Sequence, residues 1–195
     1  LLQHMHHWRK RCRKAVCLIL ELWRPGIERY ANYLSALGQF DHVFIGNRVN
    51  VEPLASRINV PCSYLPPGID AQALCPYPNP PERVLDCYSI GRRSPQVHAA
   101  LLEMAERDRL TYVYDTLNAN RVLDYREHRR LVANLGKRSR YFFAFRLNDN
   151  AERARKTGGE EGLALRFFEG AAAGTVMLGS RPRCAEHDEC FNWPD

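Results

Sequence analysis

The sequence predicts an α/β protein in which parallel strands alternate with helices along most of its 195 residues. Two observations lead to this prediction. Short apolar runs of strand length recur along the chain, and segments with helical spacing of apolar residues separate them. This alternation is typical of a parallel sheet covered by helices on both faces, which is the architecture we expect.

The first part of the chain carries three strand patterns and two helix patterns. Residues 15–23 form a continuous apolar run, which favours a strand buried on both faces, and Arg24-Pro25-Gly26 is expected to break it. Further strands are predicted over residues 41–46 and 62–65, and helices over residues 27–37 and 51–58.

Proline is concentrated between residues 66 and 82, which is the composition of a linker. We therefore expect a first domain over residues 1–70, a linker over 71–82 and a second domain over 83–195.

Alternation is more regular in the second part. Ser94-Pro95 predicts a helix start, because Ser caps free N–H groups and Pro fits the first helical position. Asp124 and Glu127 have capping-box spacing and open a helix expected to end at Gly136. The remaining predicted elements are strands over 84–90, 110–114, 141–145 and 175–178, and a helix over 163–173.

Composition narrows the class of protein. Apolar residues make up 45% and charged residues 26%, as in globular domains rather than disordered chains. No apolar run reaches the roughly 20 residues that cross a bilayer, and no secretory signal is visible. Since the chain lacks an initial Met and stops abruptly, we expect a fragment of a longer protein.

A formal charge of +6 favours anionic ligands. Basic residues gather at positions 9–14, where contact with nucleic acid, contact with an anionic membrane surface and a solvated helix face are all open. We expect the solvated face and no nucleic-acid partner.

The seven cysteines include no CxxC pair, which favours a reduced, cytosolic chain. Cys17 and Cys87 fall in predicted strands and are expected to be buried. Neither the histidines at 4, 6 and 7 nor the group Cys184, His187 and Cys190 has structural-zinc spacing, so no metal is expected.

Two segments are expected at the carboxyl ends of strands, where α/β sheets bind ligands. The first is Gly91-Arg92-Arg93-Ser94. A tight glycine turn, a helix N-terminus and two guanidinium groups suit a diphosphate, although a solvated turn with incidental arginines is the alternative. The segment is neither a dinucleotide-binding GxGxxG motif nor a Walker P-loop.

The second segment is residues 158–175, in which glycines precede a helix with largely apolar sides. Glu169 is anomalous there, because a buried carboxylate needs a partner. Arg166, three residues earlier, could be that partner, and the vicinal diol of a nucleotide ribose would serve as well.

These residues carry a resemblance. Glu161 and Glu169 are separated by seven residues, and the second begins the string EGAAAGTV. This resembles the E-x7-E signature of GT-B-fold glycosyltransferases, in the variant of the spore-maturation-type branch of family 1. Tyr64 to Asp70 (YLPPGID) resembles the end of the acceptor-side domain, and Ser89 to Arg92 (SIGR) the start of the donor-side domain. The resemblance covers most of residues 40–195.

The resemblance implies two Rossmann-like domains and transfer of a sugar from a nucleotide-diphosphate donor, without a metal or other cofactor and with retention of configuration. Glu169 would accept hydrogen bonds from the ribose, Glu161 would contact the sugar, and Arg92 would neutralise the diphosphate. The implied catalytic residues are Glu161, Arg92 and Arg93, and the implied donor-binding residues are Gly91, Gly162, Leu163, Arg166, Glu169, Gly174 and Thr175.

The chain also departs from the family. A Lys that often follows the Gly-Arg pair is absent, so either Arg93 replaces it or the donor site is altered. We expect this chain alone to be incomplete for catalysis. The acceptor (a saccharide, a lipid-linked molecule or a protein) stays open, as do a non-catalytic nucleotide-sugar-binding relative and a basic nucleic-acid-binding protein. We expect a cytoplasmic location, with the inner face of the membrane as a further option.

Overall fold

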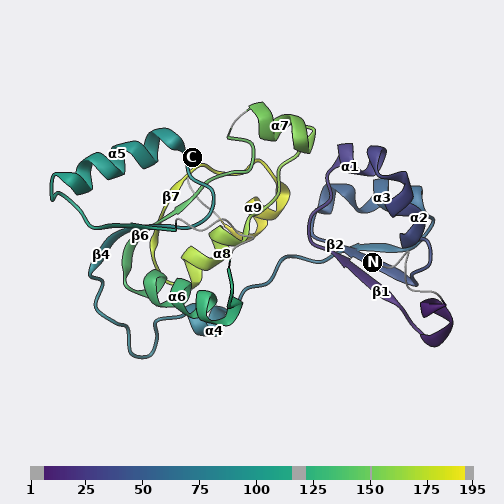
Figure 1. Cartoon of the computed structure of the whole chain (residues 1–195), viewed down its shortest axis with the longest axis horizontal. Helices are drawn as coiled ribbons and strands as arrows, with labels where there is room; N and C mark the ends of the chain where they lie inside the picture. Colours follow the sequence, from purple (N-terminus) through teal and green to yellow (C-terminus); the bar gives the residue numbers. More distant parts are fainter. Residues whose placement is uncertain (1–6, 116–121, 150, 192–195) are drawn as a thin grey trace. The chain divides into compact units, whose positions relative to one another are not determined.

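The computed structural model describes residues 7–115, 122–149 and 151–191, and these form two compact units (Figure 1). Each unit contains one parallel sheet flanked by helices, so the predicted α/β class is confirmed. The first unit takes its described residues from Leu1–Pro67, Asn150–Gly162 and Cys184–Asp195, and the second from Gly68–Asp149 and Leu163–Arg183.

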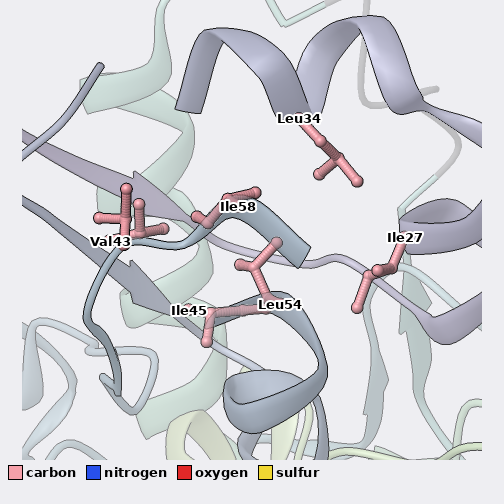
Figure 2. Close-up of a cluster of buried hydrophobic side chains, with 7 residues drawn as sticks. Ile27, Leu34, Val43, Ile45, Leu54 and Ile58 are labelled. Atoms are coloured by element: carbon pink, nitrogen blue, oxygen red, sulfur yellow. The ribbon is translucent and has the colours of Figure 1, made fainter. Parts of the chain in front are cut away.

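The first unit is built on a three-stranded parallel sheet in the order β1-β2-β3. Helices α1, α2 and α3 cover one of its faces, and Figure 2 shows their apolar side chains gathered over β2. The elements of this unit are η2 (Trp8–Arg11), β1 (Val16–Ile19), α1 (Arg24–Arg29), α2 (Ala31–Leu37), β2 (His42–Ile45), η3 (Arg48–Asn50), α3 (Val51–Ile58), β3 (Cys62–Tyr64), α7 (Ala151–Thr157) and α9 (Ala185–Cys190).

The prediction of a strand buried on both faces was wrong for β1. Val16, Leu18 and Leu20 are 62%, 51% and 73% exposed. Successive side chains of a strand point to opposite faces, and Cys17 and Ile19 pack against the core under the helices. The alternate apolar side chains therefore lie on the second face of the strand, which is exposed at these positions.

The single helix predicted over residues 27–37 is two helices. Tyr30, with φ −98° and ψ 48°, separates α1 from α2. Pro25, one of the residues expected to end the apolar run of residues 15–23, lies in the first turn of α1, where its missing N–H costs nothing.

Two residues of the basic segment at positions 9–14 form ion pairs with Asp41. Arg9 donates through Nη2 to both Asp41 carboxylate oxygens, each at 2.9 Å, and Lys14 lies 3.9 Å from the same carboxylate. The Ala15 N–H, just before β1, donates to Asp41 Oδ2 at 2.7 Å. Asp41 therefore joins the start of β1 to the start of β2.

This arrangement predicts a pH-dependent contribution to stability. The Ala15 hydrogen bond, helped by the charges of Arg9 and Lys14 and opposed by partial burial, holds the pKa of Asp41 below its ordinary value. A lowered pKa contributes stability above the unfolded-state pKa and loses it as the pH falls through the folded-state value. We expect Asp41→Asn to be less stable than wild type at pH 7, with the difference closing in acid.

Urea unfolding between pH 7 and pH 2 measures this difference. Glu28→Gln, which removes an exposed carboxylate from α1 of the same unit, is the matched control. A difference between wild type and Asp41→Asn that stays constant with pH would contradict the assignment.

The second unit is built on a four-stranded parallel sheet in the order β5-β4-β6-β7. Helix α5 packs on one face, against Cys87 and Phe143, and α6 packs on the other, against Tyr88 and Phe142. Helix α8 lies on the same face as α6. The elements are α4 (Ala71–Leu74), β4 (Leu85–Ser89), α5 (Pro95–Glu106), β5 (Tyr112–Tyr114), α6 (Tyr125–Lys137), β6 (Ser139–Ala144), α8 (Leu165–Ala172) and β7 (Val176–Gly179).

The strand order creates a switch point in this sheet. The chain runs from β4 to β5 on one side, and then crosses to β6 on the other side of β4. The connections that leave β4 and β6 therefore diverge at the carboxyl ends of these strands, and open α/β sheets bind ligands in that crevice.

The division into units differs from the expected domains in two ways. Residues 71–82, expected as a linker, contain α4, whose Leu74 is buried and which packs against α6 and α8. The segments Asn150–Gly162 and Cys184–Asp195, expected in the second domain, cluster with the first unit. Local composition could not show this, because both differences depend on contacts between segments far apart in sequence.

Within residues 7–115, 122–149 and 151–191, no helix combines the length and apolar character needed to cross a bilayer.

Candidate functional site at the carboxyl edge of the second sheet

The turn after β4 is tied to the end of β5. Gly91 has φ +78°, a conformation that side chains disfavour, and its N–H donates to Asp115 Oδ1 at 3.0 Å. Arg93 donates through Nη1 to the same oxygen at 2.6 Å and to the Asp115 carbonyl at 2.7 Å. Its guanidinium also lies over the Tyr114 ring, 5.3 Å from the centroid. Arg93 therefore holds two strand ends together.

The same turn leads into α5 as the sequence predicts. Ser94 caps the helix by accepting a hydrogen bond from Val97 N–H at 3.5 Å, and Pro95 occupies the first turn. Arg92 lies half-buried between Gly91 and Arg93. The predicted strand-glycine-arginine-helix sequence is thus present at the carboxyl edge of β4.

Glu169 is the central residue of this edge. Its side chain is 0% exposed, and each carboxylate oxygen accepts one guanidinium hydrogen bond. Arg166 Nη1 donates to Oε2, which confirms the partner predicted from sequence. Arg129 Nη2, from α6, donates to Oε1 at 2.6 Å. The burial cost of the carboxylate is therefore offset within the unit.

Sequence reasoning missed Arg129. A usable signal was present, since a helix that follows β5 begins at the carboxyl edge and Arg129 lies in the second turn of such a helix. What the sequence could not supply is which side of α6 faces α8.

The arginine pair is continuous with the Gly91 turn. A Cβ placed on Gly91 would lie 3.4 Å from Arg166 Nε, so the guanidinium packs directly against the backbone of the turn. The charge of Arg166 also affects the pKa of Tyr88, which is buried in β4. Burial raises the pKa of Tyr88 far above its ordinary value, Arg166 opposes the shift, and the charges of Asp115 and Glu169 add to it.

These contacts give the edge an excess of positive charge. Asp115 balances Arg93, and Glu169 balances one charge of the Arg129 and Arg166 pair, which leaves one guanidinium charge of that pair in excess. The N-terminal end of α8 adds its positive dipole end, because the helix begins at this edge. The arrangement is suited to binding an anion such as a phosphate group.

Two of the expected donor-binding residues lie elsewhere. Gly174, at φ +63°, ends α8, and Thr175 closes the helix by donating its hydroxyl to the Gly170 carbonyl at 2.9 Å. Both precede β7, so they lie about 12 Å from the N-terminal end of the eight-residue helix. The structure does not bring them together with Gly91, Arg166 and Glu169.

Glu161 and Gly162 belong to the first unit, whereas Leu163 begins the return to the second. The space beside Gly162 is bounded by Trp23 and by Asn47. Burial raises the pKa of Cys184 to about 11, and the charge of Glu161 contributes to that shift. The two glutamates of the predicted pair are thus parts of different units.

The carboxyl edge of the first sheet has its own polar network. Glu160 Oε2 accepts hydrogen bonds from Arg24 N–H at 3.0 Å and from Asn50 Nδ2 at 2.7 Å. Asn47 Oδ1 accepts from Leu22 N–H at 2.8 Å. Sequence analysis did not single out Glu160, whose role depends on a contact 110 residues apart.

A cavity of about 630 Å³ lies in the first unit between α7 and the residues that follow β1. Its lining combines aromatic rings with charged side chains of both signs. The lining residues are Glu21, Leu22, Trp23, Pro25, Gly26, Arg29, Tyr30, Glu152, Arg155 and Lys156.

The described part of the chain contains no group of three or more His, Cys, Asp or Glu side chains placed to hold a metal ion. The histidines at positions 4 and 6 lie outside the described residues.

Comparison with known proteins gave no relative. No family model matches the chain, and no curated protein or solved structure matches it significantly.

Proposed function

We propose that the second unit binds a nucleoside diphosphate at the crevice between the carboxyl ends of β4 and β6, as the donor-binding part of a glycosyltransferase. The observation that carries this proposal is the buried Glu169, held between Arg129 and Arg166 beside the Gly91 turn. The resemblance of the Glu161 and Glu169 segment to GT-B glycosyltransferases supports the choice of a nucleotide sugar.

The reaction would be sugar transfer from a nucleotide-diphosphate donor, without a metal and with retention of configuration. Negative charge develops on the leaving diphosphate as its bond to the sugar breaks, and fixed guanidinium groups stabilise such charge. Arg92 and Arg166 are suited to this role. Arg93, expected to share it, is committed to Asp115, so its contribution is to shape the turn.

The first unit would supply the acceptor side. Its cavity, with Trp23 and Tyr30 among charged side chains, suits an acceptor that presents both apolar and hydrogen-bonding surfaces, as a saccharide does. A lipid-linked or protein acceptor is compatible with the same proposal. Glu161, which is part of this unit, is the residue that the resemblance assigns to the transferred sugar.

Nucleotide titration tests the donor site. We expect the protein to bind one or more of UDP, GDP and ADP in calorimetry, and we expect Gly91→Val to weaken that binding at least about tenfold, since a β-branched residue strains the turn at φ +78°. Gly68→Val, at a glycine of the same unit with open space around it, is the matched control. Absence of binding by every nucleoside diphosphate would overturn the proposal.

A second measurement separates an enzyme from a non-catalytic nucleotide-sugar-binding relative. Glu161→Ala should abolish turnover of the donor while nucleotide binding is retained. A wild-type protein that binds the nucleotide but turns over no donor, with or without Glu161, would favour the non-catalytic relative.

A further inference from the structure

The two arginines that hold Glu169 come from different helices. Arg129 is in the second turn of α6, and Arg166 is in the first turn of α8. Their side chains are 43% and 27% exposed, whereas the carboxylate between them is 0% exposed. A ligand that enters this edge therefore meets the guanidinium groups first and reaches the carboxylate only if one of them moves.

The arginines also retain hydrogen-bonding capacity. A guanidinium has five N–H donors in a rigid fork, and a single hydrogen bond to Glu169 is made by each of these two. The other donors of Arg166 lie along the Gly91 turn, where Nε and Nη2 are 3.4 and 3.5 Å from the Cβ position. Planar forks of this kind match phosphate oxygens in pairs.

Glu169 limits the freedom of both side chains. An arginine side chain loses rotamer entropy on binding a ligand. A buried carboxylate that bonds both guanidinium groups removes much of that freedom before the ligand arrives. Arg93 differs from this pair, because its Nη1 donates to both the carboxylate and the carbonyl of Asp115.

We propose that Arg129 and Arg166 together bind the phosphate groups of the ligand, and that Glu169 is the positioning residue that fixes them rather than a ligand of the ribose. The proposal rests on the proposed function only for the nucleoside part of the ligand. It adds Arg129 as a binding residue and gives Glu169 a different task from the one that the family resemblance implies.

Calorimetric titration with pyrophosphate, the nucleoside diphosphate that binds best and the matching nucleoside tests this inference. We expect Arg129→Gln to weaken pyrophosphate and nucleoside diphosphate binding by about tenfold or more and to leave nucleoside binding unchanged. Arg130→Gln removes the same charge from an exposed neighbour on α6 and is the matched control, with an expected change below about twofold. Equal effects of the two variants would overturn the role of Arg129.

Glu169→Gln tests the positioning role. Removing a negative charge beside a phosphate would by itself strengthen phosphate binding. A positioning role predicts the opposite, a weaker affinity for pyrophosphate in Glu169→Gln. Adding Arg129→Gln to this variant should then cause little further loss of affinity. If Glu169 instead bound the ribose, Glu169→Gln would weaken the binding of the nucleoside and of the nucleoside diphosphate equally and would leave pyrophosphate binding unchanged. That result would overturn the assignment. If Glu169→Gln does not fold, the comparison of Arg129 with Arg130 still decides whether Arg129 binds phosphate.

The outcomes also separate this inference from the proposed function. Wild-type binding of pyrophosphate without any nucleoside diphosphate would refute the proposed function and leave the phosphate-binding pair in place. Binding of a nucleoside diphosphate that Arg129→Gln does not weaken would refute the pair and leave the proposed function in place. If wild type binds neither probe, both are refuted.

Discussion

Gly46→Ala is expected to destabilise the first unit strongly. A Cβ at this position would lie 2.2 Å from the backbone oxygen of Leu20, because the two parallel segments that follow β1 and β2 approach closely there. The backbone cannot move aside without breaking the hydrogen bond from Gly46 N–H to the Ile19 carbonyl, which measures 2.9 Å. We expect a loss of about 3 kcal/mol or more in the free energy of unfolding.

The equivalent position in the second unit is Gly179, which pairs with Ala144 across β6 and β7. A Cβ there would lie 1.8 Å from the Ala144 oxygen, and φ is +150°. Gly179→Ala should therefore destabilise the second unit to a similar degree.

Tryptophan fluorescence distinguishes the two variants in denaturant titrations. Trp8 and Trp23 belong to the first unit, and the second unit has no tryptophan in its sequence. Gly46→Ala should lower the midpoint of the fluorescence transition, and Gly179→Ala should lower the midpoint followed by circular dichroism. Gly68→Ala, with open space around its Cβ position, should change neither. Wild-type midpoints for Gly46→Ala would show that these strands do not approach as described.

The second large effect concerns the partners of Glu169. Replacing Arg129 and Arg166 together by Met keeps their aliphatic bulk but leaves a 0% exposed carboxylate without its two guanidinium partners. Removing the partners of a buried charge costs about 3–5 kcal/mol. We expect the double variant to lose stability by that amount at pH 7, measured by urea unfolding followed by circular dichroism.

A third substitution identifies the cause of the loss. Adding Glu169→Gln removes the uncompensated charge, so the triple variant should regain much of the lost stability. The matched control replaces Arg126 and Arg130, which are exposed on α6, together by Met. Its free energy of unfolding should stay near that of wild type. If the triple variant is no more stable than the double, the carboxylate is not the source of the effect.

Much of the candidate site could be predicted from local sequence. Gly91 lies in a turn with positive φ, and Ser94 with Pro95 starts a helix. Glu169 is an acidic residue in an apolar helix. Each of these features can be recognised from the few residues around it. Helical spacing places Arg166 within reach of Glu169, although the sequence also left the diol of a ribose as an alternative partner. The roles of Arg129, Asp115 and Glu160 could not be predicted, because each depends on which distant elements pack together.

The sequence by itself determined the alternation of strands and helices, the helix caps and the glycine turn at Gly91, because these follow from the conformational preferences of short segments. Tertiary structure alone decided that β1 keeps an exposed apolar side, that α4 joins the second unit, and that the described parts of Asn150–Gly162 and Cys184–Asp195 join the first. It also decided that two arginines from separate helices meet on one carboxylate. Such contacts arise from the burial of surfaces far apart in the chain, which no local pattern records.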